Sequence, residues 1–187
     1  MSIYKGLSAV QEVDSSFTPM LKLKNGESAE IRILVPADEI ISVWEYTFQA
    51  GGRWYTITQP PNREDDPLHK AGMKASFRSY IPVYNRTEER VQIFKASKTV
   101  GLQLLGLVQE YGDLTSRDFK ILRQGEKLNT TYQFFPRDPS PFDFDSVEIP
   151  DIEKMVAPKS KEEILAILEG EVKELDDLEE GEDDFPF

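Results

Sequence analysis

A two-residue alternation of apolar and polar side chains recurs in short segments between residues 29 and 135, and it restricts the fold more than any other feature of the sequence. Successive side chains of a β-strand point to opposite faces, so this pattern predicts half-buried strands. Turn sequences such as Gly51-Gly52 and Asn85 to Glu89 separate several segments and indicate hairpins. The expected strands are residues 29–35, 42–48, 53–58, 77–84, 90–95, 119–123 and 130–135.

The pattern changes to a helical period only once within this region. Ser97 can cap the start of a helix and Gly112 can end it. Between them the apolar residues recur at helical spacing: Val100, Leu104, Leu105, Val108 and Tyr111. Several strands, one principal helix and further strands predict a mainly β chain with an OB-fold-like antiparallel β-barrel and an extra hairpin. A β-sandwich or an α+β sheet is the structural alternative.

Composition divides the chain into four parts. Residues 1–28 lack a sustained period and indicate an irregular N-terminal arm, and residues 29–136 form the expected OB domain. Prolines spaced through acidic sequence indicate a linker over residues 137–173, in which the capping box from Ser160 to Glu163 predicts a short helix. Residues 174–187 are predicted to be a disordered acidic tail.

The net charge of −12 is distributed unevenly. Residues 1–139 hold 18 Lys and Arg against 17 Asp and Glu, whereas residues 140–187 hold 4 against 17. Within the first part, residues 70–98 contain seven basic and two acidic residues. A basic stripe therefore lies inside an acidic protein, and we expect the acidic tail to compete with nucleic acid for it.

Aromatic residues are interleaved with these basic residues, which is the combination that OB domains use to stack bases and follow phosphates. Alternation places Tyr80 and Tyr84 on one presumed binding face and makes Phe94 the exposed ring of the next strand. It does not decide between Trp54 and Tyr55. The candidate nucleic-acid-binding residues are Trp44, Tyr46, Arg53, Trp54, Tyr55, Lys74, Arg78, Tyr80, Tyr84, Arg86, Arg90, Phe94, Lys95 and Lys98.

The C-terminal sequence Asp183-Asp184-Phe185-Pro186-Phe187 places two rings after an acidic run, which is typical of a short docking peptide. It resembles the tips of single-stranded DNA-binding proteins of bacteria and tailed phages. Residues 66–72 and 77–86 are similar to the central part of the phage replication type, which has an OB core. The resemblance implies that the tip recruits replication proteins such as a polymerase, helicase or primase.

Related phage members often hold zinc through Cys and His, but this chain has no Cys and only His69 in the matching loop, so we expect no metal. No cofactor is expected either. Phosphate-binding and nucleophile motifs are missing from the sequence, and carboxylate pairs such as Asp65 with Asp66 or Asp143 with Asp145 are predicted to be solvated, so we expect a protein that is not an enzyme.

These observations together predict a sequence-tolerant single-stranded DNA-binding protein that coats exposed strands during phage DNA replication, recombination and repair. We expect it in the cytoplasm of the infected bacterial host, without a membrane partner, and an oligomer is compatible with the sequence. Three other functions remain open at this point: an acidic adaptor, a DNA mimic and an OB-fold RNA-binding protein.

Overall fold

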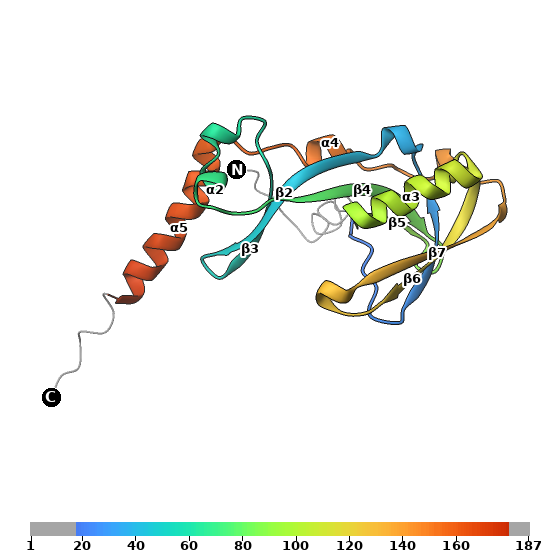
Figure 1. Ribbon diagram of the computed structural model, residues 1–187, viewed down its shortest axis with the longest axis horizontal. Helices are drawn as coiled ribbons and strands as arrows, with labels where there is room; N and C mark the ends of the chain where they lie inside the picture. Colours follow the sequence, from blue (N-terminus) through green and yellow to red (C-terminus); the bar gives the residue numbers. More distant parts are fainter. Residues whose placement is uncertain (1–17, 180–187) are drawn as a thin grey trace, which may run out of the picture. The chain divides into compact units, whose positions relative to one another are not determined.

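Seven strands form one antiparallel sheet in the computed structural model, which describes residues 18–179 and the side chains of residues 18–170 (Figure 1). The strand order is β3-β2-β4-β1-β6-β7, and β5 pairs with β4. Each strand overlaps one of the predicted segments, so the mainly β, OB-like prediction is confirmed. The strands are β1 (Ser28–Ile33), β2 (Ile41–Ala50), β3 (Arg53–Thr58), β4 (Ser76–Asn85), β5 (Arg90–Ser97), β6 (Arg117–Gln124) and β7 (Thr131–Pro139).

Helical segments lie between and after the strands. The α-helices of residues 18–179 are α2 (Pro67–Lys70), α3 (Lys98–Tyr111), α4 (Ile152–Met155) and α5 (Lys161–Glu179). Single 3-10 turns are η1 (Ala37–Glu39), η2 (Arg63–Asp65), η3 (Leu114–Ser116), η4 (Lys127–Asn129) and η5 (Phe144–Ser146). None of the helices in this part of the chain is long and apolar enough to cross a lipid bilayer.

The described residues divide into two compact units. The first unit contains residues 18–41 and 79–151, and the second contains residues 42–78 and 152–179. Strand β4 begins in the second unit and continues into the first.

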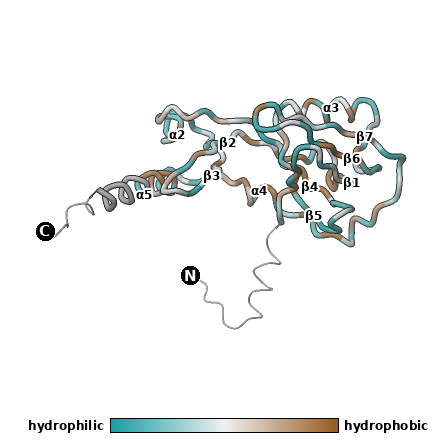
Figure 2. Tube along the Cα trace, turned by 90° about the horizontal axis from the view of Figure 1, so that it is seen from below, coloured by the Kyte–Doolittle hydropathy of each residue, from teal (hydrophilic) through white to brown (hydrophobic). Residues whose placement is uncertain are grey.

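The core of the first unit lies between the sheet and α3. Ile31, Val83, Phe119 and Ile121 are completely buried there, and hydrophobic residues concentrate where β1, β4 and β6 lie together (Figure 2). As predicted, Ser97 caps α3, since its hydroxyl accepts a hydrogen bond from the Val100 N–H at 3.4 Å. The core therefore covers one face of β1, β6 and β7 and leaves the opposite face available for other contacts.

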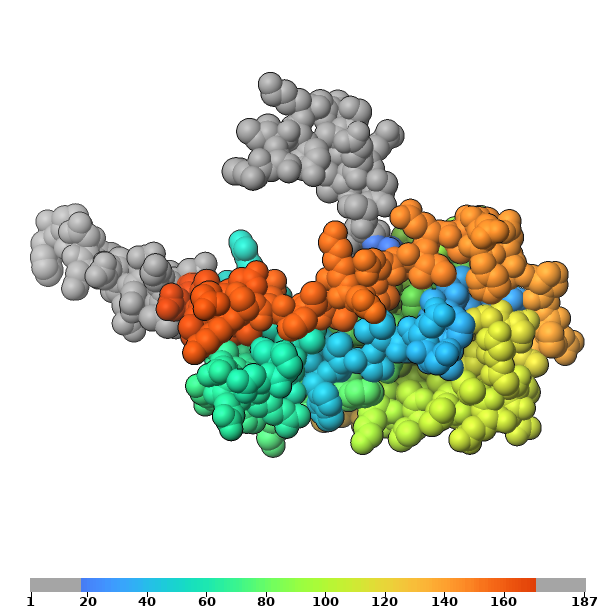
Figure 3. Space-filling model, turned by 90° about the horizontal axis from the view of Figure 1, so that it is seen from above, coloured from blue at the N-terminus to red at the C-terminus, as the bar shows by residue number. Residues whose placement is uncertain are grey.

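The second unit is built on the β2–β3 hairpin, in which Tyr46 pairs with Ile57 and Phe48 with Tyr55. Gly51 and Gly52 form its turn with φ angles of 52° and 71°, which glycine adopts without strain. Buried side chains of the hairpin pack with Leu68 of α2 and Ile164 of α5. The beginning of α5 lies beside the segment around α2 (Figure 3).

The predicted capping box is present at the start of α5. The Ser160 hydroxyl accepts from the Glu163 N–H at 3.2 Å, and the Glu163 carboxylate accepts from the Ser160 N–H at 2.7 Å. The hydrogen bond that the carboxylate accepts from the Ser160 N–H stabilises the charged form and lowers the pKa of Glu163. The helix is longer than expected. It was predicted to lie within the linker of residues 137–173, but α5 continues into the predicted tail as far as Glu179.

The polar segment from Gln59 to Met73 is also more regular than expected, since it contains η2 and α2. Asp66 is buried and caps α2 by accepting from the Leu68 N–H at 3.0 Å. Asp66 is therefore a structural carboxylate and not the solvated loop acid that the sequence suggested.

Candidate nucleic-acid interface

Trp54 is the most exposed aromatic ring among the described side chains. It lies on β3 opposite Gln49 of β2 and is 72% exposed, and its neighbour Arg53 is also exposed. Tyr55 points to the other face and stacks on Phe48 with ring centroids 5.8 Å apart. The hairpin thus fixes the backbone of Trp54 while leaving its indole face open to a ligand, and alternation places Arg53 on the opposite face of the strand with Tyr55.

The remaining candidates of the second unit include a second, less exposed indole. Trp44 is 45% exposed and contacts the edge of Phe77, with ring centroids 5.5 Å apart. Lys74 is exposed, whereas Arg78 is half-buried and donates to the Phe77 carbonyl at 2.9 Å. Trp44 therefore presents only part of its ring to solvent.

Tyr46 was predicted to bind nucleic acid, and this prediction is wrong. The side chain is 1% exposed and belongs to the core of the second unit. Its hydroxyl donates to the Asp66 carboxylate at 2.7 Å and accepts from the Gln59 amide at 2.6 Å. Burial, together with the hydrogen bond to the Asp66 carboxylate, raises the pKa of Tyr46.

A Tyr46→Phe variant is expected to lose about 1–2 kcal/mol of stability. Without the Tyr46 hydroxyl, the buried Asp66 carboxylate loses a hydrogen-bond donor and the Gln59 amide loses an acceptor. Because the pKa of Tyr46 is higher in the folded than in the unfolded protein, the folded state keeps the phenol proton more strongly. This contribution to the free energy of unfolding is complete below the ordinary tyrosine pKa of 10.0 and is lost as the pH rises through the folded-state pKa. Denaturant titrations at neutral pH and above pH 10 should show this alkaline loss in the parent and a smaller one in the variant. Equal alkaline losses would contradict the assignment.

Two further predicted stacking rings, Tyr80 and Phe94, are buried, with exposed fractions of 4% and 3%. Strand β4 has neighbours on both sides, and its residues from Ser79 to Val83 are buried on both faces. Phe94 points into the first unit's core, where its ring meets Tyr132 at 5.2 Å between centroids. The prediction that Tyr80 and Phe94 are exposed stacking rings is therefore wrong.

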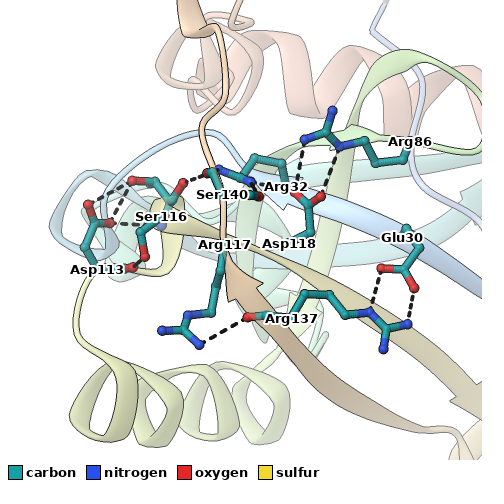
Figure 4. A network of polar contacts seen from close by, with 10 residues as sticks. Glu30, Arg32, Arg86, Asp113, Ser116, Arg117, Asp118, Arg137 and Ser140 are labelled. Carbon is teal, nitrogen blue, oxygen red and sulfur yellow. Dashed lines mark hydrogen bonds and ion pairs between the residues drawn. The ribbon is translucent and has the colours of Figure 1, made fainter.

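A polar network lies on the sheet face opposite the core of the first unit (Figure 4). Arg32 is 1% exposed, and its Nε donates to Asp118 Oδ1 at 2.6 Å. Its Nη1 donates to the carbonyl oxygens of Thr115 and Ser140, both at 3.0 Å, and its Nη2 donates to Ser140 Oγ at 2.6 Å. Arg86 reaches the same carboxylate, with Nε 3.2 Å from Asp118 Oδ2.

Aromatic rings cover this network. The Phe142 centroid lies 5.4 Å from the Arg32 guanidinium carbon and 5.0 Å from that of Arg86. Phe142 also contacts Tyr84 at 5.5 Å and Phe144 at 4.9 Å between centroids. An open hollow of about 410 Å³ adjoins the cluster and is lined by Arg32, Thr115, Ser116, Pro139, Ser140, Pro141, Phe142 and Phe144.

The other basic candidates of the first unit have different surroundings. The Lys95 ammonium lies 5.4 Å from the Tyr80 ring centroid, and exposed Arg90 forms an ion pair with Glu88. Lys98 is exposed at the start of α3. Apart from these three residues, the accessible candidates form two groups, the indoles and cations of the second unit and, in the first, the Tyr84–Arg86 cluster of Tyr84, Arg86 and the Phe142 ring that contacts both.

Arg32, Asp118, Ser140, Phe142 and Phe144 were not among the predicted site residues. The signal for the two phenylalanines is the sequence Pro141-Phe142-Asp143-Phe144-Asp145, which places rings in an acidic segment as the C-terminal tip does. Another missed ring is Phe135, which is 42% exposed and lies opposite Lys120 in the β6–β7 register.

His69 is exposed in α2, and the described part of the chain contains no group of three acidic, His or Cys side chains placed to hold a metal ion. The predicted docking tip, from Asp183 to Phe187, lies outside the described residues. Comparisons with protein-family models and with curated protein sequences found no match to this chain.

Proposed function

We propose that this protein binds single-stranded DNA without strong sequence preference and without catalysing a reaction. The observation that carries the proposal is Trp54, an indole with 72% of its surface exposed on a strand of an OB-like sheet, beside exposed Arg53. An exposed ring on a strand of an OB-like sheet provides a flat face on which another ring can stack. Unpaired bases fit because each offers an aromatic face that can stack on an indole.

The Tyr84–Arg86 cluster supports the same proposal. A guanidinium there lies near two aromatic rings, at 5.7 Å from the Tyr84 centroid and 5.0 Å from the Phe142 centroid. Arginine and aromatic faces are the groups on which proteins stack unpaired bases. Each of the two units therefore carries one candidate place for stacking an unpaired base.

The acidic C-terminal part gives the proposal its biological setting. Residues 140–187 carry 17 acidic and 4 basic residues, so they repel nucleic acid and suit a protein partner with a basic surface. In this proposal the tip recruits a replication enzyme to strands coated during phage replication, recombination or repair in the host cytoplasm.

The test is a fluorescence titration with an oligo-dT strand longer than about 16 nucleotides, the upper site size of an OB fold. Binding should quench tryptophan fluorescence and weaken steeply as salt rises, because phosphate contacts release counterions. Duplex DNA of the same length should bind much more weakly. Equal affinity for the duplex would contradict the proposal, tighter binding of the matching RNA would favour an RNA-binding protein, and no binding at all would favour the adaptor or the DNA mimic.

A further inference from the structure

The Phe142 ring contacts the Tyr84 ring and the Arg86 guanidinium, two kinds of group on which unpaired bases stack. We propose that Tyr84 and Arg86 form a nucleobase-stacking site, and that Phe142 fills this site until a base of the bound strand replaces it. This inference rests on the proposed single-stranded DNA binding. It adds to that function a defined ligand group, one unpaired base, and an internal competitor for it.

Phe142 makes a cation–π contact with Arg86 and a tilted aromatic contact with Tyr84, whose ring plane lies at 58° to its own. Its centroid lies 5.0 Å from the Arg86 guanidinium carbon and 5.5 Å from the Tyr84 centroid, which are ordinary separations for cation–π and aromatic pairs. A pyrimidine ring is planar and similar in size to the phenyl ring, and proteins use guanidinium and phenol groups as faces on which such bases stack. Neither contact involves a hydrogen bond, so another planar aromatic ring of this size can make both.

Charge favours a nucleotide over a neutral ring at this place. Two guanidinium groups, those of Arg32 and Arg86, share the single carboxylate of Asp118. One positive charge is therefore left uncompensated within this cluster, and the phosphate beside a stacked base would balance it. The segment that contains Phe142 also combines aromatic rings with negative charge, since exposed Asp143 and Asp145 flank Phe144.

The way the segment is held allows the ring to leave while the chain stays attached. Its anchor is Ser140, which accepts two hydrogen bonds from Arg32 and donates its N–H to the Ser116 carbonyl at 3.0 Å. Beyond this anchor, the hydrogen bonds that the structure describes for residues 141–146 stay within the segment, as Ser146 with Asp143 does. Only the ring contacts of Phe142 must be exchanged when a base enters.

The first measurement is the affinity of a Phe142→Ala variant for oligo-dT. A site that is free for only one-tenth to one-third of the time binds about three- to tenfold more weakly than an open one, so the variant should bind tighter by this factor. The gain should disappear in an Arg86→Ala background, which lacks the guanidinium face. Leu102→Ala is the matched control, because it shortens a 61% exposed apolar side chain of α3 and should leave affinity unchanged.

The second measurement does not depend on removing the ring. Phe142 is replaced by 4-fluorophenylalanine, and its ¹⁹F resonance is followed while oligo-dT is added to the full chain. The resonance should shift to the position of a solvent-exposed ring as the strand saturates the protein.

These outcomes separate the two proposals. If oligo-dT binds but the fluorine resonance does not move, or if Phe142→Ala binds equally or more weakly, the competitor is refuted while DNA binding stands. If oligo-dT binds neither the parent nor the variant, both proposals are refuted.

Discussion

Replacing Arg32 with alanine is expected to destabilise the first unit by about 1–3 kcal/mol, the usual cost of leaving buried polar groups without their hydrogen-bond partner. Arg32 is 1% exposed and donates four hydrogen bonds, which join Asp118 of β6 to Thr115 and Ser140. Without the guanidinium, the Asp118 carboxylate keeps only Arg86, and two carbonyl oxygens lose their donor. Denaturant unfolding followed by circular dichroism measures the loss.

Arg137 provides the matched control on the same sheet face. It forms an ion pair with Glu30, which raises the pKa of Arg137, but both side chains are exposed. Exposed pairs contribute little because water and salt screen them, so Arg137→Ala should change the free energy of unfolding far less than Arg32→Ala does. If the two variants lose similar stability, Arg32 is not the centre of the network.

Replacing Trp54 with alanine is expected to weaken binding of oligo-dT by about 1–3 kcal/mol, the usual loss for one base stack. The indole is 72% exposed, so little buried contact is lost with it, and the unfolding midpoint should stay within the range of a surface substitution. Trp54→Phe keeps a stacking face and should retain most of the affinity. Fluorescence anisotropy of labelled oligo-dT measures both variants.

Leu128→Ala is the control for Trp54, because Leu128 is a fully exposed apolar side chain in η4 without a stacking face. It should bind like the parent. If Trp54→Ala binds oligo-dT as tightly as the parent, the indole does not stack on a base. If the variant is much less stable than the parent, the indole packs against the rest of the protein and is not an exposed stacking face.

Local patterns in the sequence were sufficient for the strands and for α3. A two-residue period is a property of neighbouring residues, and the caps at Ser97 and Ser160 need only three following residues to form. The end of α5 was misjudged because a run of acidic residues indicates solvent exposure without deciding whether the backbone is helical.

The interface was harder to predict because alternation shows which side chains share a face but not which face becomes covered. Tyr80 and Phe94 were assigned outward on this basis, yet both are buried. The Arg32 network joins residues up to 108 positions apart in the sequence, and no local pattern connects Arg32 with Ser140. Such contacts depend on the sheet that brings the strands together.

The division of the second unit between two stretches of sequence has a consequence for synthesis on the ribosome. Its core needs Tyr46 and Ile57 from the hairpin and Ile164 from α5, and about 85 residues separate the end of the first stretch from Ile164. At ordinary rates of translation the hairpin must wait roughly 4–17 seconds for this helix to be made. The apolar hairpin face is uncovered during that interval, so a chaperone that shields nascent apolar segments would raise the yield of folded protein.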